Sequence, residues 1–167
     1  RIWIGTYEGG LNYFDPETGH LKKYVNDPKN FESLSSNTIT SIFKDRSGIV
    51  WIGTENGGIN MLEPEAERFS LHRHDANNPN SLSNNMAQSI YEDRSGTLWI
   101  GTSNGLNRFT PQTGRYTHYK NKKNNPRSLS NNNVNSVIQD RDGFLWIGTE
   151  SGLNRFDPES EEFKIYI

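Results

Sequence analysis

Short runs of alternating apolar and polar residues follow one another along the chain and return at a fixed interval. In the unit at 33–76 these runs cover about 38–44, 49–54, 58–62 and 68–72, and turn-forming residues separate them. Runs of this length with a period of two predict β-strands, and no segment keeps the 3.6-residue period of a helix. We therefore predict four short antiparallel strands in each unit, named A to D in chain order.

The letters Trp-Ile-Gly-Thr mark the repeat most clearly. They begin at Trp3, Trp51, Trp99 and Trp146, and a fixed step of about 48 residues indicates a repeat architecture. Aspartate, glycine, asparagine and proline residues keep the same step in the other parts of the unit. Four antiparallel strands per unit is the blade of a β-propeller.

The predicted fold class is all-β, a β-propeller fragment with about three and a half four-stranded antiparallel blades in an incomplete ring. The predicted divisions are an incomplete blade at 1–28 that lacks strand A, and complete blades at 33–76, 81–122 and 128–167. Since closed propellers contain more blades than this, we expect the chain to be a segment of a longer protein. Its two end faces are then apolar surfaces, and we expect self-association through them.

The turn between strands A and B reads DRSG, DRSG and DRDG in the three complete units. Asp45 at its first position suits a hydrogen bond to the backbone two residues on, and Gly48 suits a left-handed closing residue. Side chains alternate along strand B, so Trp51 is expected on one face of the sheet and Ile52 on the other. We interpret the repeated tryptophan as packing between neighbouring blades.

Composition removes several classes of function. The 167 residues carry a net charge of -2 and contain no block of Lys or Arg, so neither nucleic acid nor direct membrane contact is predicted. The chain has no cysteine, which excludes disulfides, Cys-ligated zinc and thiol catalysis. No apolar run approaches the roughly 20 residues of a membrane-spanning helix.

We predict no catalytic residues, no metal site and no cofactor. The carboxylates that recur in every unit, such as Asp45, are interpreted as turn residues. His72 and His74 are two apart on a predicted strand, but a tyrosine takes the position of His72 in the other units, so we interpret His72 as a packing residue. No glycine-rich phosphate loop opens a helix.

Ligand contacts are expected where the units differ, in the loops between strands B and C, which share one face of a propeller with the connections from strand D to strand A. An aromatic ring surrounded by amides and carboxylates suits the recognition of sugar hydroxyls. The candidate ligand-binding residues are Tyr7, Glu8, Glu55, Asn56, Ser103, Asn104, Glu150 and Ser151.

Two further patterns concern the interior of the propeller. A repeated Ser-Leu-Ser in each D-to-A connection predicts that its leucine anchors the crossing between two blades, with the serines bonded to backbone groups. Small polar residues in strand A are expected to line a central channel. These are Leu34, Leu82 and Leu129 in the crossings, and Thr40, Gln88 and Asn135 in strand A.

The unit SLSNNMAQSIYEDRSGTLWIGTSNGLNRFTP and its counterparts resemble the two-component regulator propeller repeat. The resemblance covers essentially the whole chain in four copies. It implies a periplasmic sensor segment of a hybrid two-component histidine kinase, without enzymatic activity of its own. Such receptors in glycan-degrading Bacteroidetes respond to oligosaccharides, so the expected partner is an oligosaccharide bound by a dimeric parent receptor.

Two other functions stay open at this point. A propeller lyase or glycosidase would place a carboxylate pair or a histidine of one blade on the central axis. A scaffold that contacts only protein would carry long apolar loop residues on one face.

Overall fold

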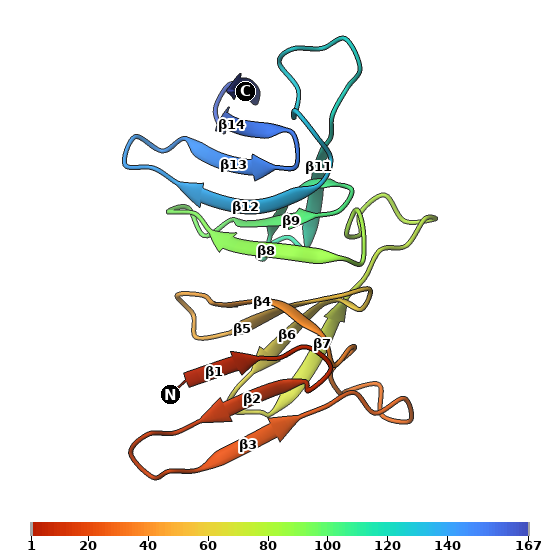
Figure 1. Ribbon diagram of the computed structural model, residues 1–167, viewed down its shortest axis with the longest axis vertical. Coiled ribbons are helices and arrows are strands. Elements are labelled where there is room, and N and C mark those ends of the chain that lie inside the picture. The colour runs from red at the N-terminus through yellow and green to blue at the C-terminus, as the bar shows by residue number, and fades with distance from the viewer. Residues whose placement is uncertain (1, 167) are drawn as a thin grey trace.

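The computed structural model describes residues 2–166, and these contain fifteen short strands. They make four antiparallel sheets that follow one another along the longest axis of the molecule (Figure 1). The first sheet holds β1 (Ile2–Gly5), β2 (Leu11–Phe14) and β3 (Leu21–Tyr24). The second holds β4 (Ile39–Lys44), β5 (Val50–Thr54), β6 (Gly58–Glu63) and β7 (Arg68–His72). The third holds β8 (Ala87–Glu92), β9 (Leu98–Thr102), β10 (Gly105–Thr110) and β11 (Arg115–Tyr119), and the fourth β12 (Val134–Gln139), β13 (Leu145–Thr149), β14 (Gly152–Asp157) and β15 (Glu162–Tyr166).

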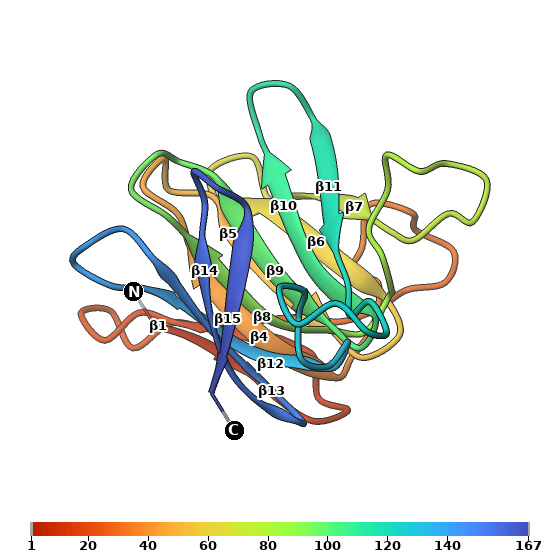
Figure 2. The same cartoon turned by 90° about the horizontal axis from the view of Figure 1, so that it is seen from above.

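Each sheet is a simple meander in which consecutive strands pair. The second, third and fourth sheets contain the predicted strands A to D, and the first contains three strands that match B, C and D. The A strands of neighbouring sheets pack against one another, β4 against β8 and β8 against β12. The all-β propeller fragment is confirmed: the sheets are arranged as blades, and they do not close into a ring (Figures 1 and 2).

The turn from strand A to strand B is closed as predicted. Asp45 Oδ1 accepts hydrogen bonds from the backbone N–H of Ser47 at 2.9 Å and of Ile49 at 3.0 Å. Gly48 has a φ of 95°, a left-handed conformation that glycine adopts without strain. The same arrangement recurs at Gly96 and Gly143, with φ values of 86° and 96°. A four-letter motif therefore fixes this hairpin in all three sheets.

The repeated tryptophan is tied to the same turn. The indole Nε1–H of Trp51 donates to Asp45 Oδ2 at 2.7 Å, and Trp99 donates to Asp93 at the same distance. Because strand B is central, a buried indole N–H needs a partner inside the protein, and the turn aspartate supplies it. One carboxylate thus closes the turn with one oxygen and holds the large ring of the strand with the other.

Alternation along strand B divides the core into layers between the sheets. Trp51 packs into a cluster with Leu98, Ile100 and Phe109 of the third sheet. Ile52, one residue on, packs in the opposite direction, in a cluster that contains Leu11 and Leu34 together with the half-buried Trp3. Each sheet therefore has a tryptophan face that points towards the next sheet and an isoleucine face that points towards the previous one.

The glycine of the Trp-Ile-Gly-Thr motif allows two A strands, that of its own sheet and that of the next sheet, to come close to strand B. A Cβ placed on Gly101 would overlap the hydroxyl of Ser89 on β8 and the side chain of Val134 on the next sheet. Gly53 is in the same position beside Ser41 and Ala87. Glycine is required here because two neighbouring A strands and one B strand meet at the same point.

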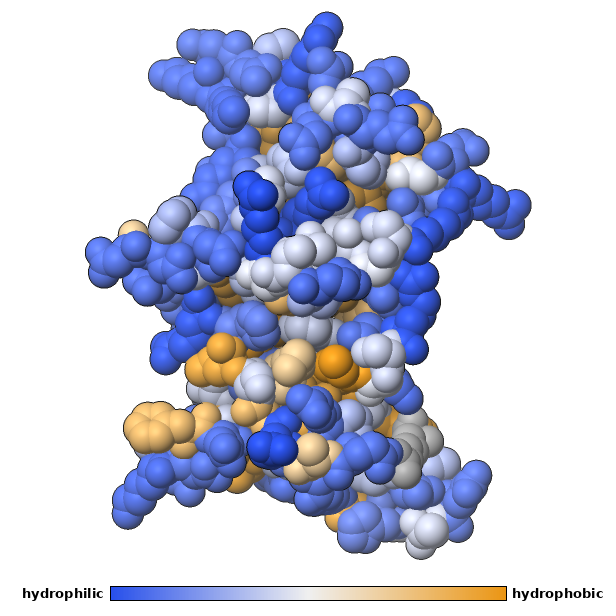
Figure 3. Space-filling view, turned by 180° about the vertical axis from the view of Figure 1, so that it is seen from behind, coloured by the Kyte–Doolittle hydropathy of each residue, from blue (hydrophilic) through white to orange (hydrophobic). Residues whose placement is uncertain are grey.

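Among residues 2–166, no sheet covers the two faces at the ends of the array. The isoleucine face of the first sheet exposes Ile2, Ile4 and Leu21, and the tryptophan face of the fourth sheet exposes Leu153 and Tyr166. Figure 3 shows apolar side chains gathered in the lower half of one side of the molecule, while its upper half is mostly polar. The two end faces repeat the two halves of an internal interface.

Replacement of Trp99 by Phe should destabilise the protein far more than the same change at Trp146. Trp99 is 1% exposed and Asp93 is buried, so the variant loses apolar area and leaves a buried carboxylate oxygen without its donor, at a cost of about 2–4 kcal/mol. Trp146 is half-buried on the open face. Urea unfolding of both variants measures the difference, and equal losses would contradict the layered packing.

Candidate functional site

The turns between strands B and C and the ends of the long D-to-A crossings form one rim of the array, which we call the upper rim. In Figure 2 the crossings that follow β3 and β7 project on the right-hand side of the molecule, and the crossing that follows β11 lies in front of the sheets. Backbone hydrogen bonds join the turns to the crossings: the N–H of Glu55 donates to the Thr38 carbonyl at 3.1 Å, and the N–H of Ser103 to the Met86 carbonyl at 3.2 Å. The upper rim is therefore built by two segments of each sheet that are held together through the backbone.

A buried leucine and a buried asparagine fix each crossing. Leu82 is fully buried between the second and third sheets, as the Ser-Leu-Ser pattern predicts. Asn107 on β10 accepts a hydrogen bond from the Ser83 N–H at 2.8 Å and donates to the Ser83 hydroxyl at 2.9 Å. Asn60 and Asn154 bond the equivalent serines. The asparagine of the Gly-Leu-Asn motif thus positions the crossing that precedes its own sheet.

The candidate residues of the first two turns are oriented mainly by the backbone. Glu8 and Asn56 have φ values of 60° and 63°, so both occupy the left-handed region that a tight turn needs. The N–H of Glu8 donates to the Thr38 hydroxyl at 3.3 Å. Tyr7 is 76% exposed at the tip of its turn. Within residues 2–166 the side chains of Tyr7, Glu8, Glu55 and Asn56 make no hydrogen bond, so they remain available to a ligand.

The candidate residues of the last two turns belong to a polar network. The Gln88 side-chain amide donates to the Ser103 hydroxyl at 3.1 Å and to Asn133 Oδ1 at 2.7 Å. Asn133 in turn donates to the Glu150 carboxylate at 2.5 Å. Ser103 and Glu150, from different sheets, are therefore connected through two amide side chains. The carbonyl oxygen of Gln88 is buried and has no hydrogen-bond partner among the described residues.

The side chains of Asn104 and Ser151 make hydrogen bonds within the loops. Asn104 Nδ2 donates to the Ser83 carbonyl at 3.3 Å, and the Ser151 hydroxyl accepts from Asn131 at 3.0 Å. No hydrogen bond between side chains joins the first two turns to the last two in the described part of the chain. The structure thus brings together Ser103 and Glu150 but leaves the residues around Tyr7 as a separate group.

Gln88 is absent from the candidate set, and a bulge explains its position. In each A strand one residue interrupts the pairing with strand B: Thr40 in β4, Gln88 in β8 and Asn135 in β12. A bulge redirects the side chain of the extra residue. The sequence carries a weak indication of this, since these positions vary between units while the serine that follows them does not.

His72 packs as expected for a core residue of an outer strand. Its ring lies 5.1 Å from Phe109 and 5.6 Å from Trp51, and its Nδ1 is 2.9 Å from the Tyr116 hydroxyl. Burial lowers the pKa of His72, because the charged imidazolium is disfavoured away from water. The prediction that His74 shares this strand is wrong: β7 ends at His72, and His74 Nδ1 lies 2.7 Å from the Leu82 carbonyl in the crossing.

The described residues hold neither a metal-binding cluster nor a membrane-spanning helix. Residues 2–166 contain no group of three or more His, Asp or Glu side chains arranged to hold a metal ion. The described residues also contain no helix long and apolar enough to cross a membrane. A catalytic role would need the turn aspartates. Each of them already accepts hydrogen bonds from a tryptophan indole and from the backbone N–H groups of its turn. The Trp146 hydrogen bond, together with backbone N–H donors, lowers the pKa of Asp140.

Comparison with protein families matches the two component regulator propeller at residues 33–56, 81–104 and 128–151. No curated protein matches the chain. Among solved structures, the chain is similar to an extracellular domain described as part of a hybrid two component system, BT3049 of B. thetaiotaomicron. The identity is 27%, the TM-score is 0.81, and the match covers 97% of this chain and 21% of the other.

Two further structures share the fold. An extracellular domain of a second B. thetaiotaomicron hybrid system, BT4673, has a TM-score of 0.74 at 24% identity and covers 98% of this chain and 22% of its own. PorZ, a surface component of the type-IX secretion system of Porphyromonas gingivalis, has a TM-score of 0.69 at 13% identity, over 99% and 25% of the two chains. The chain thus spans about a fifth to a quarter of the length of these proteins. Since the matched family is regulatory, the prediction that this segment is not an enzyme is confirmed.

Replacement of Asn107 by Leu should destabilise the protein by about 2–4 kcal/mol, because the Ser83 N–H and the Ile100 carbonyl would be buried without their partner. The matched control is Asn77→Leu in an exposed part of the same crossing. Chemical denaturation measures both. A loss below about 0.5 kcal/mol at Asn107 would show that the asparagine does not hold the crossing.

Proposed function

Three segments of this chain belong to the two component regulator propeller repeat family, and we propose that the chain is a ligand-sensing propeller segment of a hybrid two-component sensor histidine kinase. We place it in the periplasm, in the extracytoplasmic part of a dimeric inner-membrane receptor. Its proposed ligands are oligosaccharides derived from glycans. The observation that carries the proposal is the match, over 97% of this chain, to an extracellular domain of a hybrid two component system.

The upper rim supplies groups that suit a sugar. Glu55 and Glu150 offer carboxylate acceptors, and Asn133 and Gln88 offer amide groups that both donate and accept. Tyr7 adds an exposed ring on which the apolar face of a pyranose can stack. The unpaired, buried Gln88 carbonyl oxygen is an acceptor that a ligand hydroxyl or a water would satisfy.

Binding would signal through the network that joins two sheets. A ligand that accepts from Gln88 or Asn133 competes with the hydrogen bonds to Ser103 and Glu150. A ligand shifts a receptor only if it binds one state better than the other. We propose that the angle between the third and fourth sheets differs between those states, since this network spans that boundary.

We also propose that the two apolar end faces mediate self-association. The tryptophan face of one copy has the chemistry that packs on the isoleucine face of another, as it does at each internal boundary. Sedimentation velocity over a range of concentrations should show a dimer, and Leu153→Glu on the exposed tryptophan face should shift the protein to monomer. A wild-type protein that stays monomeric at about 0.1 mM would overturn this part of the proposal.

Binding of oligosaccharides tests the function directly. A panel of neutral and uronic-acid oligosaccharides is titrated into the chain by calorimetry after a thermal-shift screen. The Tyr7→Ala and Glu150→Gln variants should each bind the best ligand roughly 3- to 10-fold more weakly, through the loss of a stacking surface or of a charged acceptor.

The matched control is Glu159→Gln, an exposed carboxylate in the turn between β14 and β15 on the opposite rim. It should bind as the wild type does. Absence of binding by every oligosaccharide would remove the glycan part of the proposal, and equal weakening by all three variants would remove the upper rim as the site.

A further inference from the structure

The third crossing, residues 120–133, carries a positive charge that the other two crossings lack. Four of its positions hold a base: Lys120, Lys122, Lys123 and Arg127. In the second crossing the same four positions hold one base and one acid, and in the first they hold two acids and no base. Since all three crossings are copies of one repeat, the four bases are a departure from the repeat and not a requirement of the fold.

The backbone of the crossing is held in the same way in all three copies. The N–H of Lys122 donates to the Ser128 hydroxyl at 3.0 Å, as the N–H of Asp75 does to the Ser81 hydroxyl. The carboxylates of Asp27 and Asp75 also accept a backbone N–H two residues on, at 2.9 Å. Lys122 takes the place of these aspartates, and an ammonium group cannot accept a hydrogen bond. The third crossing therefore lacks this turn-closing contact and has a cation in its place.

The bases of the crossing line a groove between the outer strands of the third and fourth sheets. The groove has a volume of about 290 Å³, and its lining includes Lys120, Lys122 and Arg127 together with the rings of Tyr119 and Phe163. Phe163 is buried, and its N–H donates to the Arg127 carbonyl at 3.3 Å. Because this bond ties the crossing to β15, the groove is formed before any ligand enters it.

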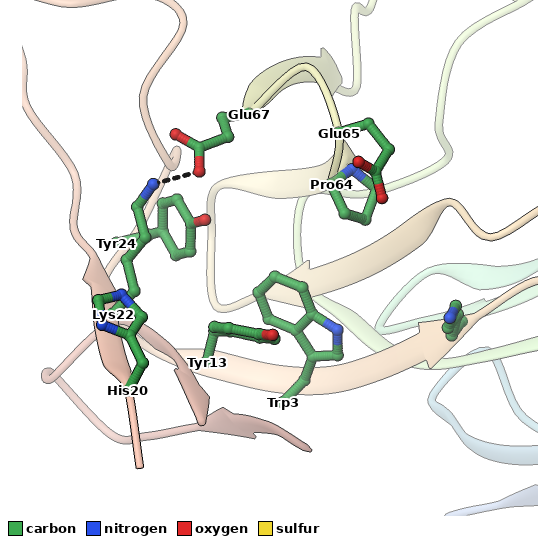
Figure 4. Close-up of a pocket in the computed structure, with 9 residues that line it drawn as sticks. Trp3, Tyr13, His20, Lys22, Tyr24, Pro64, Glu65 and Glu67 are labelled. Atoms are coloured by element: carbon green, nitrogen blue, oxygen red, sulfur yellow. Dashed lines mark ion pairs between the residues drawn. The ribbon is translucent and has the colours of Figure 1, made fainter. Parts of the chain in front are cut away.

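The corresponding groove between the first and second sheets also contains a lysine, but that lysine is paired. Lys22 on β3 lies 2.5 Å from the Glu67 carboxylate (Figure 4), and this hydrogen bond raises the pKa of Lys22. Glu161 takes the position of Glu67 in the fourth sheet. It accepts the Tyr119 hydroxyl at 2.7 Å and pairs with Arg108 at 3.6 Å. Glu161 is therefore already engaged by other groups and leaves the lysines of the third crossing unpaired.

Two ammonium groups and one amide of the groove are available to a ligand. Arg127 pairs with Glu162 at 2.6 Å. Within residues 2–166, Lys120 and Lys122 have neither an ion pair nor a side-chain hydrogen bond. The side-chain oxygen of Asn125 accepts the N–H of Arg127 at 3.0 Å, while the N–H groups of that amide have no partner in the described part of the chain. The groove thus contains two uncompensated positive charges beside a neutral donor.

We propose that this groove binds an oxoanion, a phosphate or sulfate group that is either free or esterified to a sugar. Such a group has several terminal oxygens, which suit donors that come from separate side chains. A phosphate monoester carries a charge close to −2 at pH 7, which balances the two lysines. Lys120 and Lys122 supply the attraction as point charges, and the Asn125 amide orients the group. The site uses none of the candidate residues of the upper rim.

An NMR titration of the isotope-labelled chain at low ionic strength tests the site. The probes are inorganic phosphate, inorganic sulfate, glucose-6-phosphate, glucose-6-sulfate and unmodified glucose. We expect saturable amide shifts confined to residues 120–128 and 161–163, with a Kd of about 0.1–5 mM for the oxoanions and no shift with glucose. Because the groove is open to water, added sodium chloride should weaken the binding. Tighter binding of the esters identifies a sugar-borne group as the ligand, and equal affinities identify the free ion.

Lys122→Asp is the most informative variant, because it restores the residue of the other two crossings. The aspartate should close the turn as Asp27 and Asp75 do, so thermal stability should be unchanged or higher. The reversed charge should abolish oxoanion binding. Lys122→Gln removes only the charge and should bind about 3- to 10-fold more weakly.

The matched control is Lys123→Gln, which changes the net charge by the same amount. Lys123 is exposed on the same crossing and lies outside the lining of the groove, so this variant should bind within about twofold of the wild type. Three results would overturn the proposal. These are the absence of saturable shifts at about 20 mM of every oxoanion probe, full affinity of Lys122→Asp, and an equal loss in Lys122→Gln and Lys123→Gln. Neutral oligosaccharides at the upper rim should bind Lys122→Asp as they bind the wild type, so the two proposals fail separately.

Discussion

A single carboxylate in each A-to-B turn organises the structure. One oxygen of Asp93 accepts the N–H groups that close the turn, and the other accepts the indole of Trp99. Since the same group fixes the hairpin and the ring, the orientation of the tryptophan is determined within its own sheet before any neighbour packs against it. A sheet that carries a prealigned ring of this size presents a defined surface to the next sheet, and this is what allows one unit to be repeated.

Repetition then makes every interface asymmetric. The tryptophan face of one sheet meets the isoleucine face of the next, as in the contact of Trp99 with Phe156 at 5.5 Å. An array built from such contacts has two unlike ends, and each end has the chemistry that satisfies the other. Stability therefore depends on nearest neighbours, and the outer sheets, with one covered face each, are held less firmly than the inner ones.

The sequence predicts the parts of the fold that the repeat duplicates. The four strands, the left-handed Gly48 and the opposite directions of Trp51 and Ile52 follow from alternation and turn chemistry, because these depend on residues close together in the chain. The partner of the indole was not predicted, although Asp45 is only six residues away. Identification of that partner requires the pairing of strands A and B, and a period of two does not specify the pairing.

The candidate site was less predictable for a related reason. Topology alone predicts that the loops between strands B and C share one rim, but the Ser103–Gln88–Asn133–Glu150 network depends on a bulge that redirects Gln88. A bulge leaves the alternation of apolar residues on both sides intact, so it is invisible in the hydrophobic pattern. Similarly, the spacing of histidines in HRH suggested one strand face, whereas the strand ends between them.

Function in such an array must come from departures from the repeat. Asp45 and Asn60 already hold a turn or a crossing through hydrogen bonds, and Leu82 is buried in a crossing. The equivalent residues of the other sheets have the same contacts. Groups remain available only where a unit lacks its usual partner or carries an unusual side chain. The upper rim has both, in the buried Gln88 carbonyl oxygen and in Tyr7. The regularity that makes this chain easy to fold is thus what makes its few irregular positions informative.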